Sequence, residues 1–206
     1  MPPSTVTRDA FARAVAVLRS ARPRREIAVS ELSPPRRLAP YAYALGAAVQ
    51  APDAGPAGGR STAGRGPAGA GGPEGDAEIA TGRLVLLYDP AGQPGWRGTM
   101  RLVSYVSTPL EHDLAADALI SEVGWSWLVE ALDSHGAAYA ALAGTVTRIT
   151  STRFGELAGR PPETDLEIRA SWTPEGDLQA HVAAWCTLLA SAAGLPPPGV
   201  RALPGR

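Results

Sequence analysis

The chain contains no lysine, no asparagine and a single cysteine among its 206 residues, so all 19 of its Lys and Arg positions are arginines. Without lysine, a Schiff-base mechanism and the phosphate-binding lysine of a Walker-type loop are both excluded. The single Cys186 cannot form an internal disulfide, which is typical of a protein from a reducing compartment.

Long apolar runs are missing as well. No segment approaches the roughly 18 consecutive apolar residues that span a bilayer. Arg8, Asp9 and Arg13 interrupt the N-terminal segment, which argues against a secretory signal. We therefore expect a cytoplasmic protein that does not contact membranes. The missing lysine and asparagine have A-rich codons, whereas the abundant Ala, Gly, Pro and Arg have G/C-rich ones, so the composition indicates a high-GC bacterium, with an actinobacterium as the first candidate.

One segment differs sharply in composition from the rest of the chain. Residues 51–77 are almost entirely Gly, Ala and Pro and include no large apolar side chain, so this segment cannot offset the entropy cost of ordering itself. The length of the chain suits one domain. We expect a single α+β domain over residues 7–196, interrupted by a disordered loop at 51–77 and followed by a frayed tail at 197–206.

Three segments are predicted to be helices. Apolar residues at helical spacing predict the first over about 7–22. The second helix has two possible starts, a capping-box pattern at Thr108 and an N-cap at Asp117, and we favour Asp117. It ends at Gly136. Only one narrow stripe of this helix is polar, so we expect it to be packed on most of its circumference. The last helix extends from Asp177 to Gly194.

Six segments are predicted to be strands, one of them short. The clearest is the last, where Leu166, Ile168 and Trp172 alternate with charged and polar residues, as in a strand with one buried face. The segment after Tyr88 is rich in turn residues and predicts a hairpin. The expected strands cover residues 26–32 (the short one), 41–49, 78–88, 97–107, 139–153 and 165–172.

These elements follow the order α-β-β-β-α-β-β-α, with the short strand at 26–32 as an additional early member. Short turns between neighbouring strands favour antiparallel pairing over βαβ crossovers. We therefore expect an α+β fold, a mostly antiparallel five- to six-stranded sheet with helices on one face. The element order resembles type III secretion chaperone-like folds, and a fold does not by itself fix a function.

Five segments carry a resemblance to a known family: Arg37-Leu-Ala-Pro-Tyr-Ala-Tyr-Ala-Leu, Ala80-Thr-Gly-Arg-Leu-Val-Leu-Leu-Tyr-Asp-Pro, Val123-Gly-Trp-Ser-Trp-Leu, Gly144-Thr-Val-Thr-Arg and Arg169-Ala-Ser-Trp-Thr-Pro. Together they are similar to the actinobacterial domain of unknown function 3000 family, over about residues 8–196 without the 51–77 segment. The resemblance implies no activity. It implies a cytoplasmic actinobacterial protein, often encoded near a ribonuclease D-like gene.

No group of residues has the spacing of a metal or catalytic site. Glu111, His112 and Asp113 are consecutive, so they do not converge on one ion from a helix or a strand. Ser126 lies within a predicted helix and lacks the second glycine of a nucleophile elbow. Cys186 is expected in mid-helix as core filling. We expect no metal, no cofactor and no catalytic residue, and an enzyme with an unrecognised site remains an alternative.

The sequence favours a non-catalytic protein-binding role, as an adaptor, chaperone-like or regulatory module that binds a protein partner or forms a homo-oligomer. Trp125 and Trp127 point about 200° apart on a helix, so at most one can face a ligand, and core packing of both is the other possibility. In the binding hypothesis Trp125 lies in a groove beside Trp96 or Tyr105, because exposed Trp and Arg anchor interfaces. The candidate partner-binding residues are Trp96, Arg101, Tyr105, Trp125, Arg148 and Arg153.

An accessory RNA-binding role in RNA processing or decay is the main alternative. The N-terminal part of the chain is rich in arginine, and clustered arginines bind phosphates. The net charge of -1 and the sequence pI near 6.3 give this hypothesis little support. The candidate polyanion-binding residues are Arg22, Arg24, Arg25, Arg36 and Arg37.

Overall fold

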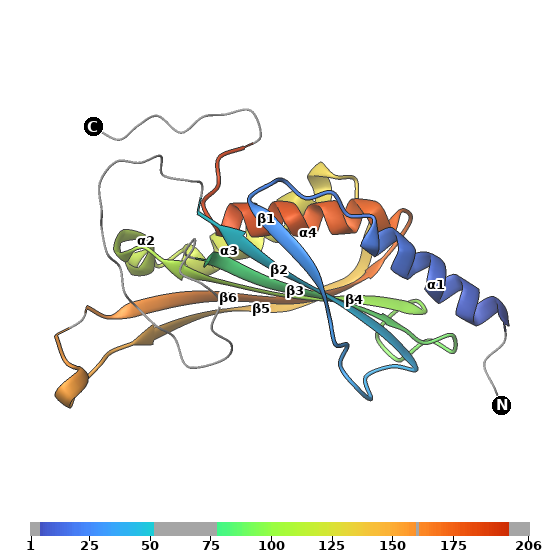
Figure 1. Cartoon of the computed structure of the whole chain (residues 1–206), viewed down its shortest axis with the longest axis horizontal. Coiled ribbons are helices and arrows are strands. Elements are labelled where there is room, and N and C mark those ends of the chain that lie inside the picture. Colours follow the sequence, from blue (N-terminus) through green and yellow to red (C-terminus); the bar gives the residue numbers. More distant parts are fainter. Residues whose placement is uncertain (1–4, 52–77, 160, 198–206) are drawn as a thin grey trace.

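The computed structural model describes residues 5–51, 78–159 and 161–197 and has the predicted order of elements, including the early strand (Figure 1). Apart from residues 51 and 197, the loop predicted at 51–77 and the tail predicted at 197–206 lie outside the described residues. The elements are α1 (Thr5–Arg19), β1 (Ile27–Leu32), β2 (Tyr41–Gln50), β3 (Glu78–Tyr88), β4 (Met100–Leu110), α2 (His112–Ala116), α3 (Ile120–Ser134), β5 (Tyr139–Ser151), a 3-10 turn (Gly155–Leu157), β6 (Glu163–Pro174) and α4 (Leu178–Ala192).

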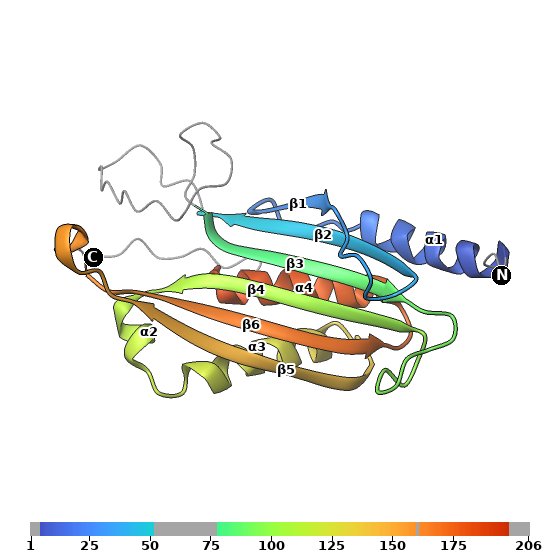
Figure 2. The same ribbon diagram turned by 90° about the horizontal axis from the view of Figure 1, so that it is seen from below.

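The six strands form one sheet in the order β1-β2-β3-β4-β6-β5, and every neighbouring pair is antiparallel. The helices α1, α3 and α4 lie on one side of this sheet and leave the other side open (Figures 1 and 2). The predicted α+β fold with an antiparallel sheet and helices on one face is therefore confirmed. The last two strands do not follow the order of the sequence in the sheet. β6 pairs with β4, and β5, which precedes β6 in the chain, forms the edge.

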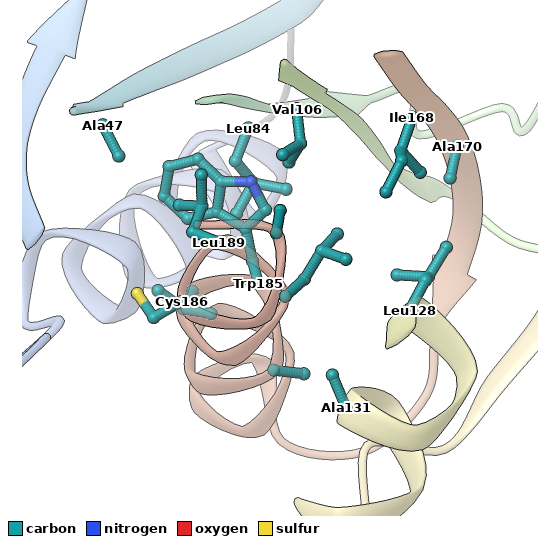
Figure 3. Packing of buried hydrophobic residues seen from close by; sticks show 14 of the residues in the cluster. Ala47, Leu84, Val106, Leu128, Ala131, Ile168, Ala170, Trp185, Cys186 and Leu189 are labelled. Atoms are coloured by element: carbon teal, nitrogen blue, oxygen red, sulfur yellow. The ribbon is translucent and has the colours of Figure 1, made fainter. Parts of the chain in front are cut away.

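The core lies between the sheet and the helices. In β6, the fully buried Leu166 and Trp172 face the helices and alternate with residues that face the open side. Trp185 of α4 is also fully buried and points toward the sheet beside Leu84 and Leu189 (Figure 3). Large aromatic side chains thus fill the space between α4 and the strands, which is where burial stabilises this fold most.

Of three sequence patterns that predict helix ends, two are confirmed by the structure and one is wrong. Asp177 caps α4 as predicted, because its Oδ1 accepts a hydrogen bond of 2.9 Å from the backbone N–H of Gln179. Gly136, with φ of +61°, follows the end of α3 as predicted. The capping-box pattern at Thr108 does not start a helix, because this residue belongs to β4 and its hydroxyl bonds to the carbonyl of Ile79.

The helix α3 is less enclosed than its sequence predicts. Its buried residues form a single stripe, and Val123 is 37% exposed while both tryptophans are half-buried. The expectation of packing around most of the circumference is wrong, because the main contacts of α3 are with α4 and with the strands β5 and β6. Residues buried in the stripe are Ile120, Gly124, Leu128, Ala131 and Leu132.

Candidate protein-binding surface

The face of the sheet that carries no helix holds a shallow trough of about 580 Å³. It crosses β4, β6 and β5, where Tyr105, Arg169 and Thr145 stand opposite one another in register. Strand alternation places them there, because their neighbours in sequence, such as Ser104 and Ala170, face the helices. The trough therefore combines an aromatic ring, a cation and a hydroxyl on a rigid surface.

The guanidinium of Arg169 lies over the ring of Tyr105. Its guanidinium carbon lies 5.3 Å from the ring centroid, and Nη2 is 2.8 Å from Oε2 of Glu167. The hydroxyl of Tyr105 donates a hydrogen bond of 2.9 Å to Oε1 of the same carboxylate. Burial, and then this bond to Glu167, raise the pKa of Tyr105, so it stays protonated. Glu167 and Arg169 are close neighbours on β6, and their contact with Tyr105 depends on strand pairing that the sequence does not reveal.

Arg101 and Trp96 close one end of the open face. Arg101 is 91% buried and donates to Oγ of Ser171 at 2.8 Å and to Oγ1 of Thr173 at 3.3 Å. No carboxylate of the described residues forms an ion pair with it, and burial lowers its pKa. The hydroxyl of Thr173 also donates to the carbonyl of Trp96, whose ring packs on a small apolar cluster around Leu87. Both predicted site residues therefore fasten the β3–β4 loop to the sheet.

The strand β5 forms one edge of the sheet and has 13 residues. Within the described residues it pairs only with β6, so its outer backbone groups have no strand partner. Residues such as Thr145, Thr147 and Ile149 are exposed, and the strand contains neither lysine nor proline. Proteins normally protect long edges with charges, prolines or short strands. The protective features of β5 are the charged Arg148 and a bulge between Ala140 and Ala143.

Trp125 lies over β5 on the helix side of the sheet. A Cβ at Gly144 would come within 2.7 Å of Cζ3 of Trp125 and would also collide with the carbonyl oxygen of Arg169. The missing side chain at this position therefore allows the indole to approach the strand. Trp125 is half-buried, so this contact leaves the residue partly exposed to solvent.

The six predicted partner-binding residues do not line one groove. Trp125 and Arg148 lie on the helix side of the sheet, whereas Tyr105 lies on the open face, so the strands separate them. The proposed groove with Trp125 beside Trp96 or Tyr105 is thus not formed. Nη1 of Arg148 instead donates to the carbonyls at the end of α2, at 3.0 and 3.2 Å.

Arg153 follows β5 in the loop that joins it to β6. Its Nη2 lies 2.6 Å from Oε2 of Glu163, so the two ends of the loop are fastened together. Beyond this pair, Phe154 and Leu157 are 79% and 70% exposed at the tip of the hairpin. This predicted site residue therefore belongs to the protruding end of the β5–β6 hairpin (Figure 2).

The predicted polyanion-binding arginines fall into two groups. Arg22, Arg24 and Arg25 lie between α1 and β1, whereas Arg36 and Arg37 lie in the loop after β1. The six residues of β1 span roughly 20 Å between them. In addition, both Arg24 and Arg25 pair with the carboxylate of Glu26, at 3.1 and 3.8 Å. They form no single patch for a phosphate backbone.

His135 and Cys186 line a common pocket, whereas His181 is not among its lining residues. His181 is fully buried and accepts a hydrogen bond from the indole of Trp172, while His135 lies 2.8 Å from the hydroxyl of Thr187. Burial raises the pKa of Cys186 to about 11, so its thiol is protonated at neutral pH. Within the described residues, no three His, Cys, Asp or Glu side chains lie close enough together to hold a metal ion. No described helix combines the length and hydrophobicity that a membrane span requires.

These features define an α+β protein whose helices cover one face of an antiparallel sheet. The family model described as "Protein of unknown function (DUF3000)" matches residues 7–201, and the chain belongs to this family. The resemblance carried by its sequence segments is thereby confirmed. No curated protein and no solved structure matches the chain. The likeness to type III secretion chaperone-like folds remains one of element order.

Proposed function

We propose that this DUF3000 protein is a non-catalytic protein-binding module that receives an extended segment of a partner along β5. The observation that carries the proposal is the free outer edge of this 13-residue strand. An extended peptide added to such an edge gains a ladder of backbone hydrogen bonds.

The two sides of β5 offer different surroundings to such a segment. On the helix side the half-buried Trp125 lies over Gly144. On the open side lies the trough with Tyr105, Thr145 and Arg169. Because side chains of an added strand alternate between the two sides, one set would meet the indole and the other the trough. This arrangement supports selective binding by an adaptor or chaperone-like protein.

The matched pair Thr147→Lys and Ser30→Lys tests this role. Both positions are exposed and lie in edge strands, Thr147 in β5 and Ser30 in β1 at the opposite edge. A lysine discourages strand addition. The wild-type protein is used to capture partners from a lysate of its source organism, and affinities of the purified partner are then measured. We expect Thr147→Lys to weaken binding by about tenfold or more, roughly 1.4 kcal/mol, and Ser30→Lys to leave it unchanged.

Hydrogen exchange of the complex locates the contact. The amides of β5 should become protected when the partner binds, and those of β1 should not. Equal affinities of the two lysine variants, or protection confined to β1, would contradict the proposal. If the purified protein dimerises in sedimentation velocity and Thr147→Lys alone abolishes the dimer, the partner is a second copy of this chain.

A further inference from the structure

A pocket of about 500 Å³ opens in the helical layer, away from the open face of the sheet. One side of α4 provides much of its wall, through Val182, Ala183, Cys186 and Ala190. The segment between α1 and β1 and the residues after α4, such as Leu195, complete it. Pockets of roughly 300–1,000 Å³ with mostly apolar walls are typical small-molecule sites.

The polar side chains around this pocket are neutral or cationic. Arg22, Arg24 and His135 line it, and none of the described residues that line it is acidic. The charge of Arg24 is already compensated, because Nη2 lies 3.1 Å from Oε1 of Glu26 and Nη1 donates to the carbonyl of Pro196 at 2.7 Å. Arg22 therefore supplies the cation that an anionic ligand would meet.

Arg22 is exposed, and its guanidinium makes only a long bond of 3.4 Å to the adjacent carbonyl of Ala21. Within the described residues it forms no ion pair. A carboxylate at this side chain would gain a charge-assisted hydrogen bond without displacing an existing partner.

The inner wall of the pocket is uncharged. Cys186 lies on a different side of α4 from Trp185, which points toward the sheet (Figure 3). Burial keeps the Cys186 thiol protonated, as its raised pKa indicates, and a neutral thiol behaves as a small apolar group. An alkyl chain placed along this side of α4 would therefore contact hydrocarbon and sulfur.

We infer that this pocket binds a single amphipathic carboxylate, such as a medium-chain fatty acid. Its alkyl chain lies along Val182, Ala183 and Cys186, and its carboxylate binds the guanidinium of Arg22. The size of the pocket, its apolar wall and its positive charge carry this assignment. The site is independent of β5, because it lies in the helical layer and uses none of the residues of the trough.

Calorimetric titration of the full-length chain tests the site with decanoate, below its micelle concentration, and with the uncharged decanol. We expect one decanoate per chain, bound about 1.5- to fivefold more tightly than decanol, which is the range of an exposed ion pair. Arg22→Gln should weaken decanoate by that factor and leave decanol unchanged. If the wild-type chain does not bind decanoate, the proposed carboxylate site is wrong. This holds even if another segment or partner fills the pocket.

Two further variants separate the pocket from nonspecific binding. Ala183→Leu fills the pocket while keeping a good helix former, and we expect it to weaken both ligands more than tenfold. Ala16→Leu makes the same change at an exposed position of α1 and should leave both affinities unchanged. Unaltered binding by Ala183→Leu would place the ligand elsewhere. Equal affinities for decanoate and decanol, or equal losses for both in Arg22→Gln, would remove Arg22 as the partner of the carboxylate.

Labelling of the single cysteine gives a test that needs no substitution. Because Cys186 lines the pocket, bound decanoate should slow its reaction with a small uncharged thiol reagent. A labelling rate that decanoate does not change would contradict the proposed position of the alkyl chain.

Discussion

The buried side chain of His181 should make the stability of this protein depend on pH. Its Nδ1 lies 3.1 Å from Nε1 of Trp172. An indole N–H can only donate, so Nδ1 must accept, and the proton of the neutral ring is on Nε2. Nε2 in turn donates to the carbonyl of Glu175 at 3.3 Å. Protonation of Nδ1 would bring two donors face to face in the core.

Burial lowers the pKa of His181 from its ordinary value of 6.5. The unfolded chain therefore binds a proton at this residue at a higher pH than the folded chain does. The stability that the neutral His181 ring contributes is complete above pH 6.5. It is lost as the pH falls through the lowered pKa of the folded state. Between these two values, one proton changes the free energy of unfolding by about 1.4 kcal/mol for each pH unit.

Urea unfolding followed by tryptophan fluorescence measures this effect. We expect the free energy of unfolding to fall from pH 6.5 to 5.5, by up to about 1 kcal/mol. Glu26 and Glu31 do not contribute in this range, because arginine partners lower their pKa values. His181→Asn keeps an acceptor for Trp172 but does not titrate, so its stability should stay constant.

The exposed His112 provides the matched control, and His112→Asn should retain the wild-type slope. A wild-type stability that does not change between pH 6.5 and 5.5 would refute the reasoning. So would a slope that persists in His181→Asn, because another group would then be its source.

Three further substitutions test the packing and the helix ends by chemical denaturation. Gly144→Ala should cost about 1–3 kcal/mol, because its Cβ collides with Trp125, and an unchanged stability would mean that α3 and β5 are farther apart. Trp127→Ala should lower the free energy of unfolding by about 1.5–3 kcal/mol, because the ring is half-buried. Trp185→Ala, which removes a fully buried ring, should lower it by roughly 3–5 kcal/mol. Equal losses in the two variants would contradict this ranking. Asp177→Ala removes the cap of α4 and should cost about 1 kcal/mol, so a loss below 0.3 would show that water replaces it.

The sequence predicts those elements whose signal is local. The alternation in β6, the cap at Asp177 and the ending at Gly136 depend on residues within a few positions of one another, and each is present as expected. The start of α3 is less well predicted, because its N-cap is Leu119 and not the favoured Asp117. The other candidate, Thr108, has two competing signals, a capping pattern and β-branching. Pairing across β4 and β6 favours the strand there.

The candidate binding surface could not be predicted because it depends on long-range pairing. Tyr105, Thr145 and Arg169 meet only because β6 inserts between β4 and β5, a strand order that nothing in the local pattern specifies. The prediction that Trp125 lies on a helix is confirmed. Whether Trp125 can contact Tyr105 depends on which side of the sheet this helix covers. One-sided packing of the helices separates the two rings.

The helix α4 carries more apolar surface than the sheet requires. A helix on one side of a sheet needs one apolar stripe, and Trp185 and Leu189 provide it against the strands. On the pocket side Val182 and Cys186 are also buried, whereas Ala183 is only partly buried. Ala183→Gln therefore should leave the free energy of unfolding within about 0.5 kcal/mol, because glutamine is also a good helix former. Loss of decanoate binding in a variant of unchanged stability would show that the ligand, and not the fold, requires an apolar side chain at this position.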